Sequence, residues 1–356
     1  MQRIEYGLGA VDEALRAAGS RRCMLVCGSS FDRLGVSGQV RAGVRFSAFT
    51  PNPRYEDVCR GVSLFNDEGC DALVAVGGGS AIDVAKCIKL FCRMDHGRNY
   101  LEQEFADSGV PLIAVPTTAG TGSESTRFAV VYLDGEKQSV SHWSIVPDVA
   151  VLEPRLLASL PPYQKKSAML DALCQAVESW WSVNSTEESI GYSRKAVRLV
   201  AGWWREYIEE GSEASLERMM LAANLSGRAI NISQTTAPHA MSYKLTSMYG
   251  VPHGHAVAMC LPLVWRYMER HAEGCVDPRG KYHLAGVLGD IGSELGGADG
   301  FESMMASLCL LPVRSSSREA DLDVLARSVN PVRLKNNPVR LDEAALRGFY
   351  EAIVKE

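Results

Sequence analysis

The stretch Asp71-Ala-Leu-Val-Ala-Val-Gly-Gly-Gly-Ser-Ala-Ile-Asp-Val-Ala-Lys86 predicts a buried strand, a glycine turn and the start of a helix. Three successive glycines leave backbone N–H groups uncovered, and the N-terminus of the helix adds partial positive charge, so a pyrophosphate can bind there. The run differs from the usual G-x-G-x-x-G pattern of dinucleotide-binding proteins. Taken alone, it therefore leaves a purely structural tight turn as an alternative.

The pattern on both sides of this stretch predicts two domains. Short apolar runs alternate with helical patterns through the first 150 or so residues, which is typical of a mostly parallel α/β sheet. Strands are expected at 23–27, 45–49, 71–76, 111–115, 128–132 and 149–152, with helices at 56–68 and 81–92. After Leu160-Pro-Pro162 the pattern becomes helical almost throughout, up to a last amphipathic helix at 342–354. We expect an α/β dinucleotide-binding domain over residues 1–160 and an all-α metal- and substrate-binding domain over residues 161–356.

A second small-residue loop, Pro116-Thr-Thr-Ala-Gly-Thr-Gly-Ser123, follows another predicted strand. Ligands of parallel α/β sheets bind outside the carboxyl ends of the strands, and both loops fall there, so together they favour a nucleotide. Gly28-Ser29-Ser30 follows the first strand, where an acidic residue would contact an adenosine ribose. Glycine leaves room for a 2′-phosphate and the serines can hydrogen-bond it, which favours NADPH over NADH.

Possible metal ligands are concentrated between residues 171 and 255. Asp171 and Gln175 are four residues apart on a predicted helix, so both side-chain oxygens lie on one face. His239, His253 and His255 follow within 17 residues of one another. Two imidazoles and two oxygens suit a divalent cation that keeps a position open for substrate. Spacing alone also allows a solvated polar pair and ordinary loop histidines.

Composition excludes several classes of function. The net charge is −5 and no run of five or more basic residues appears, so we expect no nucleic-acid partner. No apolar stretch reaches the roughly 18 to 20 residues of a membrane span, and the N-terminus lacks the apolar core of a signal peptide. Ten cysteines are scattered without paired spacing, which favours free thiols in a reducing compartment. We expect a cytoplasmic protein.

Together these segments resemble the iron-containing (group III) alcohol dehydrogenase family. The Gly-Gly-Gly-Ser-Ala-Ile-Asp-Val-Ala-Lys run, the Pro-Thr-Thr-Ala-Gly-Thr-Gly-Ser-Glu run and the His-x13-His pair occur in the family's order and cover nearly the whole chain. The resemblance implies an NAD(P)H oxidoreductase acting on an aldehyde or alcohol, with iron or zinc held by Asp171, Gln175, His239 and His253, and it favours a homodimer. The candidate cofactor-binding residues are Gly28, Ser29, Ser30, Asn52, Gly77, Gly78, Gly79, Ser80, Asp83, Thr117, Thr118, Thr121, Ser123, Thr126 and Lys137.

Two positions depart from the family pattern. The family usually has histidine where Gln175 stands, and a neutral amide oxygen is a weaker donor for iron or zinc. The family also usually has a histidine facing the nicotinamide at the position of Tyr243, one helical turn after His239. Tyr243, His255 or a chain of water molecules are therefore the candidates for delivering a proton to the product alkoxide.

The segments around Gln175 and His239 resemble the branch of the family that reduces phosphonoacetaldehyde to 2-hydroxyethylphosphonate in phosphonate natural-product biosynthesis. A phosphonate needs cations near the metal. The candidates, each of which could equally be a surface charge, are Arg127, Lys165, Lys166 and Lys244. The alternatives are a general short-chain aldehyde or alcohol dehydrogenase, a sugar-phosphate cyclase-type lyase of the same fold, and a nucleotide-binding protein without metal.

Overall fold

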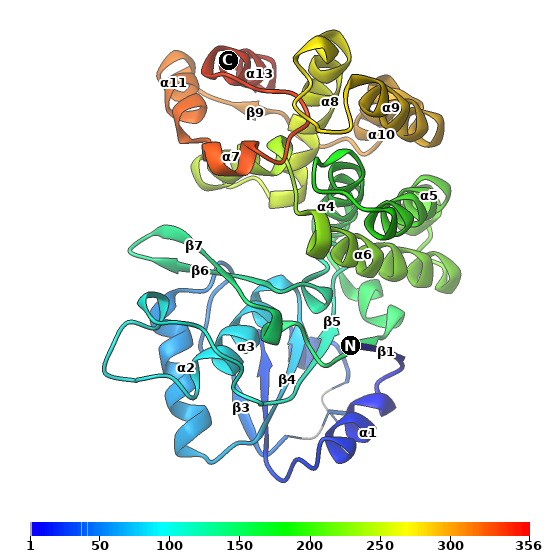
Figure 1. Ribbon diagram of the computed structural model, residues 1–356. Coiled ribbons are helices and arrows are strands. Elements are labelled where there is room, and N and C mark those ends of the chain that lie inside the picture. The colour runs from blue at the N-terminus through cyan, green and yellow to red at the C-terminus, as the bar shows by residue number, and fades with distance from the viewer. Residues whose placement is uncertain (1, 37, 41) are drawn as a thin grey trace. The chain divides into compact units, whose positions relative to one another are not determined.

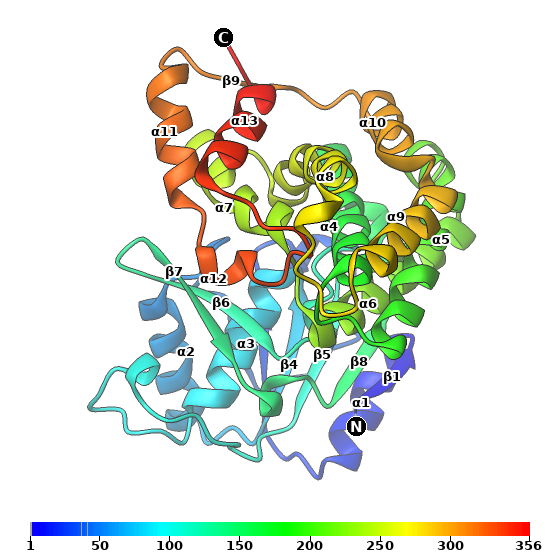
Figure 2. The ribbon, with the colours of Figure 1, turned by 45° about the horizontal axis from the view of Figure 1, so that its top comes forward.

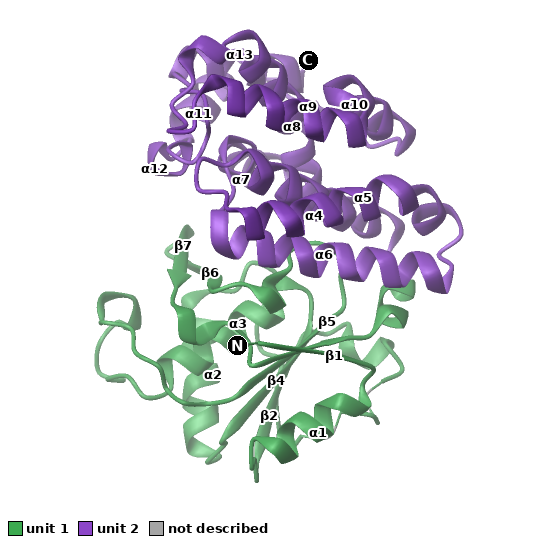
Figure 3. Cartoon of the chain, turned by 45° about the vertical axis from the view of Figure 1, so that its right-hand side comes forward, with its two compact units in different colours: residues 1–160 green, residues 161–356 purple. Residues whose placement is uncertain are grey.

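The computed structural model describes residues 2–36, 38–40 and 42–356. The chain divides into two compact units, Met1–Leu160 and Pro161–Glu356 (Figure 3). The first unit contains a parallel sheet with helices, and the second is built almost entirely from helices (Figure 1). This is the α/β plus all-α fold class that the sequence predicts.

The sheet of the first unit has six strands in the order β1-β8-β5-β4-β2-β3, and every neighbouring pair is parallel. The strands are β1 (Arg3–Tyr6), β2 (Cys23–Cys27), β3 (Val44–Phe46), β4 (Ala72–Gly77), β5 (Leu112–Pro116) and β8 (Val149–Leu152). Parallel strands have their carboxyl ends at one edge of the sheet. Because β2, β4 and β5 are neighbours, the loops that follow them share that edge, where ligands of such sheets bind.

Helices cover both faces of this sheet, because its central strands are apolar on both sides. Met24 and Val26 of β2 pack in one hydrophobic core with α2 and α3, whereas Leu25 and Cys27 pack in another with α1. Strands buried on both faces are typical of parallel sheets. The three helices are α1 (Gly9–Ala17), α2 (Tyr55–Asp67) and α3 (Gly79–Phe91).

The predicted strand at 128–132 lies outside the main sheet. It is β6 (Phe128–Leu133), which forms an antiparallel hairpin with β7 (Glu136–Ser141). Asp134 and Gly135 form the turn with φ values of 52° and 79°. Two left-handed residues make the type I′ turn whose twist matches a hairpin, and Asp-Gly is a strong signal for it. The strand β1, at the edge of the main sheet, was not predicted.

The second unit is helical apart from β9 (Val313–Arg314) and β10 (Val354–Lys355), which pair with each other. Its helices are α4 (Pro162–Trp181), α5 (Glu187–Glu209), α6 (Glu213–Ser233), α7 (Ala237–Tyr249), α8 (His253–Arg270), α9 (Lys281–Leu295), α10 (Gly297–Ser307), α11 (Arg318–Ser328), α12 (Pro331–Leu334) and α13 (Glu343–Ile353). None of the described helices combines the length and the apolar character that crossing a membrane requires.

The helix α4 is the centre of this unit and carries half of the predicted metal ligands. Every residue from Met169 to Trp181 is buried, because α5, α6, α8 and α9 pack around it. A helix buried all round its circumference is a core helix rather than an amphipathic surface helix. Polar side chains on α4 are therefore enclosed by protein and must find partners there.

Candidate metal centre and cofactor loops

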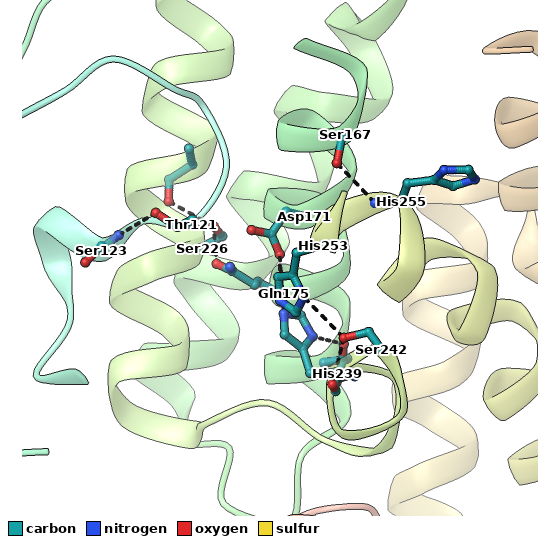
Figure 4. Close-up of polar contacts among 12 residues, drawn as sticks. Thr121, Ser123, Ser167, Asp171, Gln175, Ser226, His239, Ser242, His253 and His255 are labelled. Carbon is teal, nitrogen blue, oxygen red and sulfur yellow. Dashed lines mark hydrogen bonds and ion pairs between the residues drawn. The ribbon is translucent and has the colours of Figure 1, made fainter. Parts of the chain in front are cut away.

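The four predicted metal ligands come from three helices of the second unit. Asp171 and Gln175 lie one turn apart on α4, His239 lies in the first turn of α7, and His253 is the first residue of α8. Their side chains point toward one another (Figure 4). The Nε2 atom of His239 lies 3.4 Å from Oδ1 of Asp171, and Nε2 of His253 lies 4.0 Å from the same oxygen.

A glycine allows the start of α8 to come this close to α4. A Cβ atom at Gly254 would collide with the carbonyl oxygen of Ser167 and lie 2.8 Å from the backbone nitrogen of Asp171. A Cβ atom does not come this close to atoms to which it is not bonded, so no other residue fits at this position without moving one of the two helices. Gly254 directly follows His253, so it fixes the separation between His253 and Asp171.

The cluster has the donor atoms and the unmet polar demand of a metal site. One ligand atom each from Asp171, His239 and His253 lies within 4.8 Å of the other two. Oδ1 of Asp171 and Nε2 of His239 are buried and make no hydrogen bond. A buried polar atom left unpaired costs about 1 to 3 kcal/mol, so two of them facing each other call for a ligand. A divalent cation fits, because it takes imidazole nitrogen and carboxylate oxygen as ligands.

Neighbouring groups orient both imidazoles for this role. The Nδ1–H of His239 donates to the buried carboxylate of Glu178. The hydroxyl of Ser242 donates to the carbonyl oxygen of His239 at 2.8 Å, so its oxygen accepts from Nδ1 of His253 at 3.3 Å. With Nδ1 as the donor in each ring, the lone pair of a neutral imidazole is on Nε2, which faces Asp171.

Glu178, which holds His239 by a hydrogen bond, is not among the residues that the sequence predicts for the site. It is fully buried on α4, one turn after Gln175 and two turns after Asp171. Its Oε2 accepts hydrogen bonds from the backbone nitrogen of Thr236 at 2.7 Å and from the Thr236 hydroxyl at 3.0 Å. The i, i+4, i+7 spacing of three polar residues on one helix face is the signal that could have found it.

The carboxylates also set the charge of the site. Burial opposes the protonated form of His239, but the carboxylates of Glu178 and Asp171 outweigh burial and raise the pKa of His239 to about 9. Burial of Asp171 alone would raise its pKa, but interactions with His239 and His253 prevail and lower it. The lowered pKa of the buried Asp171 carboxylate favours a bound cation.

Gln175 is buried beside Asp171, and its Oε1 lies 3.3 Å from the hydroxyl of Ser226. That hydroxyl also lies 2.8 Å from the carbonyl oxygen of Ala223, to which it can donate. The oxygen of Ser226 can then accept from the Gln175 amide nitrogen if the amide is turned over. Either amide atom can therefore face Asp171, so a ligating oxygen is compatible with the surroundings.

The structure treats the two predicted proton donors differently. The ring of Tyr243 stacks on the ring of His253, with centroids 5.6 Å apart and planes 4° apart. His255 points away from the ligand cluster (Figure 4), and its Nδ1 shares a hydrogen bond with the hydroxyl of Tyr163 at 2.9 Å. Burial lowers the pKa of His255 to about 4. The structure thus brings Tyr243, and not His255, to the cluster.

Two of the predicted phosphonate-binding cations are engaged elsewhere in the second unit. The Nζ atom of Lys165 lies over the ring of Tyr207, 4.4 Å from its centroid. The Nζ atom of Lys166 donates to the carbonyl oxygen of Leu308 at 2.9 Å. Neither lysine is brought to the ligand cluster.

The other two predicted cations are Arg127 and Lys244. In the first unit, the guanidinium of Arg127 lies over the rings of Phe128 and Trp143, 4.8 and 4.3 Å from their centroids. Lys244 is half-buried on α7, and among the described residues its side chain makes no contact with the ligands. A different cation, Arg333, lies near the cluster: its Cζ atom is 5.3 Å from the centroid of the Tyr243 ring.

In the first unit, the two predicted cofactor loops touch at the carboxyl edge of the sheet. A Cβ atom at Gly78 would lie 3.2 Å from the Thr118 side chain, and one at Gly79 would lie 3.0 Å from Thr121. Larger residues would force the loops apart. The loop after β2 (Gly28, Ser29, Ser30) follows the neighbouring strand, and both serines are exposed.

Three predicted cofactor-binding side chains have partners within the unit. Oδ1 of Asp83 accepts from the Ser123 hydroxyl at 2.6 Å, and its Oδ2 accepts from the backbone of Val130 at 3.0 Å. The buried ammonium of Lys86, which the sequence reasoning did not assign, donates to Ser123 and Thr126, each at 3.0 Å. These contacts hold the second loop and the hairpin in place.

The remaining predicted cofactor residues lie in loops or at strand ends of the same unit. Asn52 is exposed and has a φ of 58°, just before Pro53. Lys137 is half-buried on β7. Ser80 and Thr117 lie in the two touching loops, at the first turn of α3 and directly after β5.

Comparisons with known proteins agree with this geometry. The model of the iron-containing alcohol dehydrogenase family matches residues 2–154, and that of the family's C-terminal domain matches residues 166–313. Phosphonoacetaldehyde reductase of Streptomyces viridochromogenes is 35% identical over 293 residues, which are 78% of this chain and 74% of the relative.

Solved structures of the family have the same fold. Sulfoacetaldehyde reductase of Bifidobacterium kashiwanohense, in complex with NAD+, matches with a TM-score of 0.87 and 26% identity, over 99% of this chain and 96% of that chain. An iron-containing alcohol dehydrogenase of Thermococcus thioreducens matches with a TM-score of 0.89 at 24% identity, over 99% and 98% of the two chains. The chain therefore belongs to the iron-containing alcohol dehydrogenase family, and it is an NAD(P)-dependent oxidoreductase that uses a divalent metal.

Proposed function

We propose that the enzyme reduces phosphonoacetaldehyde to 2-hydroxyethylphosphonate, as a step in the biosynthesis of phosphonate natural products. The observation that carries this proposal is the 35% identity to a phosphonoacetaldehyde reductase, joined to the Asp171–His239–His253 cluster, in which two buried polar atoms have no hydrogen-bond partner. The structural match to a sulfoacetaldehyde reductase adds support, because that enzyme's name also describes a two-carbon aldehyde with an anionic head group.

Asp171, Gln175, His239 and His253 would hold the metal. When bound, a divalent ion supplies a Lewis acid for the carbonyl oxygen, and the reduced nicotinamide supplies the hydride. Glu178 and Ser242 keep both imidazoles in the tautomer that presents Nε2.

We assign the proton-delivery position to Tyr243. Its phenol ring lies face to face with the ligand His253, so its hydroxyl belongs to the immediate surroundings of the cluster. The alkoxide formed by hydride addition needs a proton, which the phenol can give directly or through water. His255, turned toward Tyr163, has no such position.

We further propose that the cofactor is NADPH, held by the touching loops after β4 and β5 and by Gly28, Ser29 and Ser30 after β2. Two exposed serines offer hydroxyl donors to a 2′-phosphate. Gly28 has no atom within 4 Å of where a Cβ would lie, so space is available there. A homodimer stays a prediction.

The test is oxidation of NADPH by metal-reconstituted enzyme with phosphonoacetaldehyde, propanal or lactaldehyde at matched concentrations. We expect kcat/KM to be about 100-fold higher for phosphonoacetaldehyde, equivalent to about 2.7 kcal/mol of transition-state binding. Equal values for the three aldehydes would leave a general short-chain aldehyde reductase and refute the phosphonate assignment.

A further inference from the structure

One cation close to the ligand cluster, Arg333, lies outside the family motifs. Arg333 belongs to α12, a one-turn helix that packs against α7 (Figure 2). Its guanidinium lies over the ring of Tyr243, with Cζ 5.3 Å from the ring centroid. The ring of the ligand His253 stacks on the same Tyr243 ring.

Within the described part of the chain, the charge of Arg333 is not used in an ion pair. Among residues 2–36, 38–40 and 42–356, no carboxylate lies within ion-pair distance of its guanidinium, and its described side-chain contact is the face of Tyr243. The side chain is half-buried rather than free in solvent. A guanidinium over an aromatic ring keeps its five N–H donors at the ring's edges available for hydrogen bonds.

We infer that Arg333 is the residue that binds the anionic head group of the substrate, an assignment that rests on the proposed function. A guanidinium matches the paired oxygens of a phosphonate and stays charged at any working pH. The Tyr243 ring, fixed against His253, holds the guanidinium at a set distance from the ligand cluster. Arg333 thus takes the role that the sequence reasoning offered to Arg127, Lys165, Lys166 and Lys244.

The distances suit a two-carbon substrate. The ring centroid of Tyr243 lies 5.6 Å from that of His253 and 5.3 Å from Cζ of Arg333, so the imidazole and the guanidinium are at most about 11 Å apart, the sum of the two. The oxygens at the two ends of phosphonoacetaldehyde are roughly 4 Å apart, and a hydrogen-bond length at each end brings the span to roughly 10 Å.

The competing explanation is that Arg333 only covers the Tyr243 ring. If Arg333 only packs on the Tyr243 ring, replacing it should change kcat/KM equally for charged and uncharged aldehydes. If it binds the head group, the replacement should lower kcat/KM mainly for the anionic substrate. The measurement is therefore the ratio of kcat/KM for phosphonoacetaldehyde to kcat/KM for propanal, in the metal-loaded holoenzyme. A second readout is the Kd of ethylphosphonate, which carries the head group without the carbonyl, measured by calorimetry with no turnover.

We expect Arg333→Gln to lower the ratio about 30-fold, because a hydrogen-bonded charge pair with the substrate is lost. The Kd of ethylphosphonate should rise at least about 10-fold, and Arg333→Lys should fall between wild type and Arg333→Gln because lysine is a point charge. The matched control is Lys335→Gln, which removes an exposed cation two residues away and should leave both readouts at the wild-type value.

The outcomes separate the inference from the function it rests on. If the wild type prefers phosphonoacetaldehyde but Arg333→Gln keeps the same ratio and the same Kd, the function stands and the inference is overturned. The inference is likewise overturned if Lys335→Gln lowers the ratio as much as Arg333→Gln. If the wild type shows no preference, the proposed function fails, and Arg333-dependent binding of ethylphosphonate alone would still support an anion site there. Absence of ethylphosphonate binding in that case would overturn both.

Discussion

Replacing Glu178 by glutamine isolates the part that orientation plays in holding the metal. The carboxylate accepts from Nδ1 of His239 on one oxygen and from the backbone and hydroxyl of Thr236 on the other. An amide has a single acceptor oxygen, so in either orientation its NH2 group faces a donor. Loss of such a carboxylate partner typically lowers metal affinity by 10- to 100-fold, or about 1.4 to 2.7 kcal/mol.

A second effect acts in the opposite direction near neutral pH. The charge of Glu178 helps to raise the pKa of His239 to about 9, so a metal must displace a proton from that ring at pH 7.5. Because pH 7.5 is 1.5 units below this pKa, removing the proton costs about 2 kcal/mol. Glutamine lowers the pKa of His239 and relieves part of this cost. The loss of affinity in Glu178→Gln is therefore expected to be small at pH 7 and to reach its full 10- to 100-fold at pH 9.

The assay is competition between the metal-free protein and a chelator for Zn²⁺ at several pH values from 7 to 9. Circular dichroism checks that the variant is folded. Glu269→Gln is the control, because it removes an exposed carboxylate from α8, the helix that carries His253, and leaves the cluster alone. A Glu178→Gln affinity within twofold of wild type at pH 9 would refute the reasoning, as would an equal loss in Glu269→Gln.

Three further predictions follow from positions described above. Gly254→Ala should lower the free energy of unfolding by about 3 kcal/mol and the metal affinity at least tenfold, because α8 must move away from α4. Urea unfolding and metal titration measure the two losses. Gly202→Ala is the control without loss, because its Cβ would have no atom within 4 Å. Gly28→Asp should lower kcat/KM for NADPH about tenfold or more while sparing NADH, since a carboxylate repels a 2′-phosphate; the uncharged Gly28→Asn should not, and equal losses with both cofactors would contradict the assigned position. Burial lowers the pKa of Lys86 to about 8 from its ordinary value of 10.5, so between these pH values the unfolded chain binds more protons than the folded one. The free energy of unfolding should therefore rise with pH in this range, by up to about 3 kcal/mol more in wild type than in Lys86→Met. Parallel pH profiles of the two proteins in urea unfolding would disprove this.

Much of the fold follows from local pattern. The apolar runs at 23–27 and 149–152 are β2 and β8 to the residue, because strands buried on both faces are continuous apolar segments between turns. β1 could not be recognised in the same way, since Arg3–Tyr6 is four residues long and lies at the edge of the sheet with two exposed positions. Asp134-Gly135 indicates a hairpin turn after β6, but β7 is largely polar and has a single buried residue, so no apolar run marks it as a strand.

The residues of the candidate site also differ in whether the sequence can predict them. Helical spacing brings Asp171 and Gln175 together, and the same spacing extended by one turn would have found Glu178. Arg333 had no such signal, because it is 90 residues from Tyr243 in the chain and meets it only through the packing of α12 against α7. Lone lysines and arginines carry no sequence mark that tells a head-group ligand from a surface charge. Their assignment needs the tertiary structure.

The residues proposed to recognise the cofactor's phosphates all lie before residue 160, whereas the metal ligands, Glu178, Tyr243 and Arg333 all lie after it. Choice of nucleotide and choice of aldehyde are then inherited on separate stretches of one gene. A recombination event near Leu160 between two members of the family would exchange the preference for one nucleotide or one class of aldehyde and leave the other preference unchanged. Chimaeras joined at that residue should therefore pair either coenzyme with either class of aldehyde, and new substrates could evolve without rebuilding the nucleotide site.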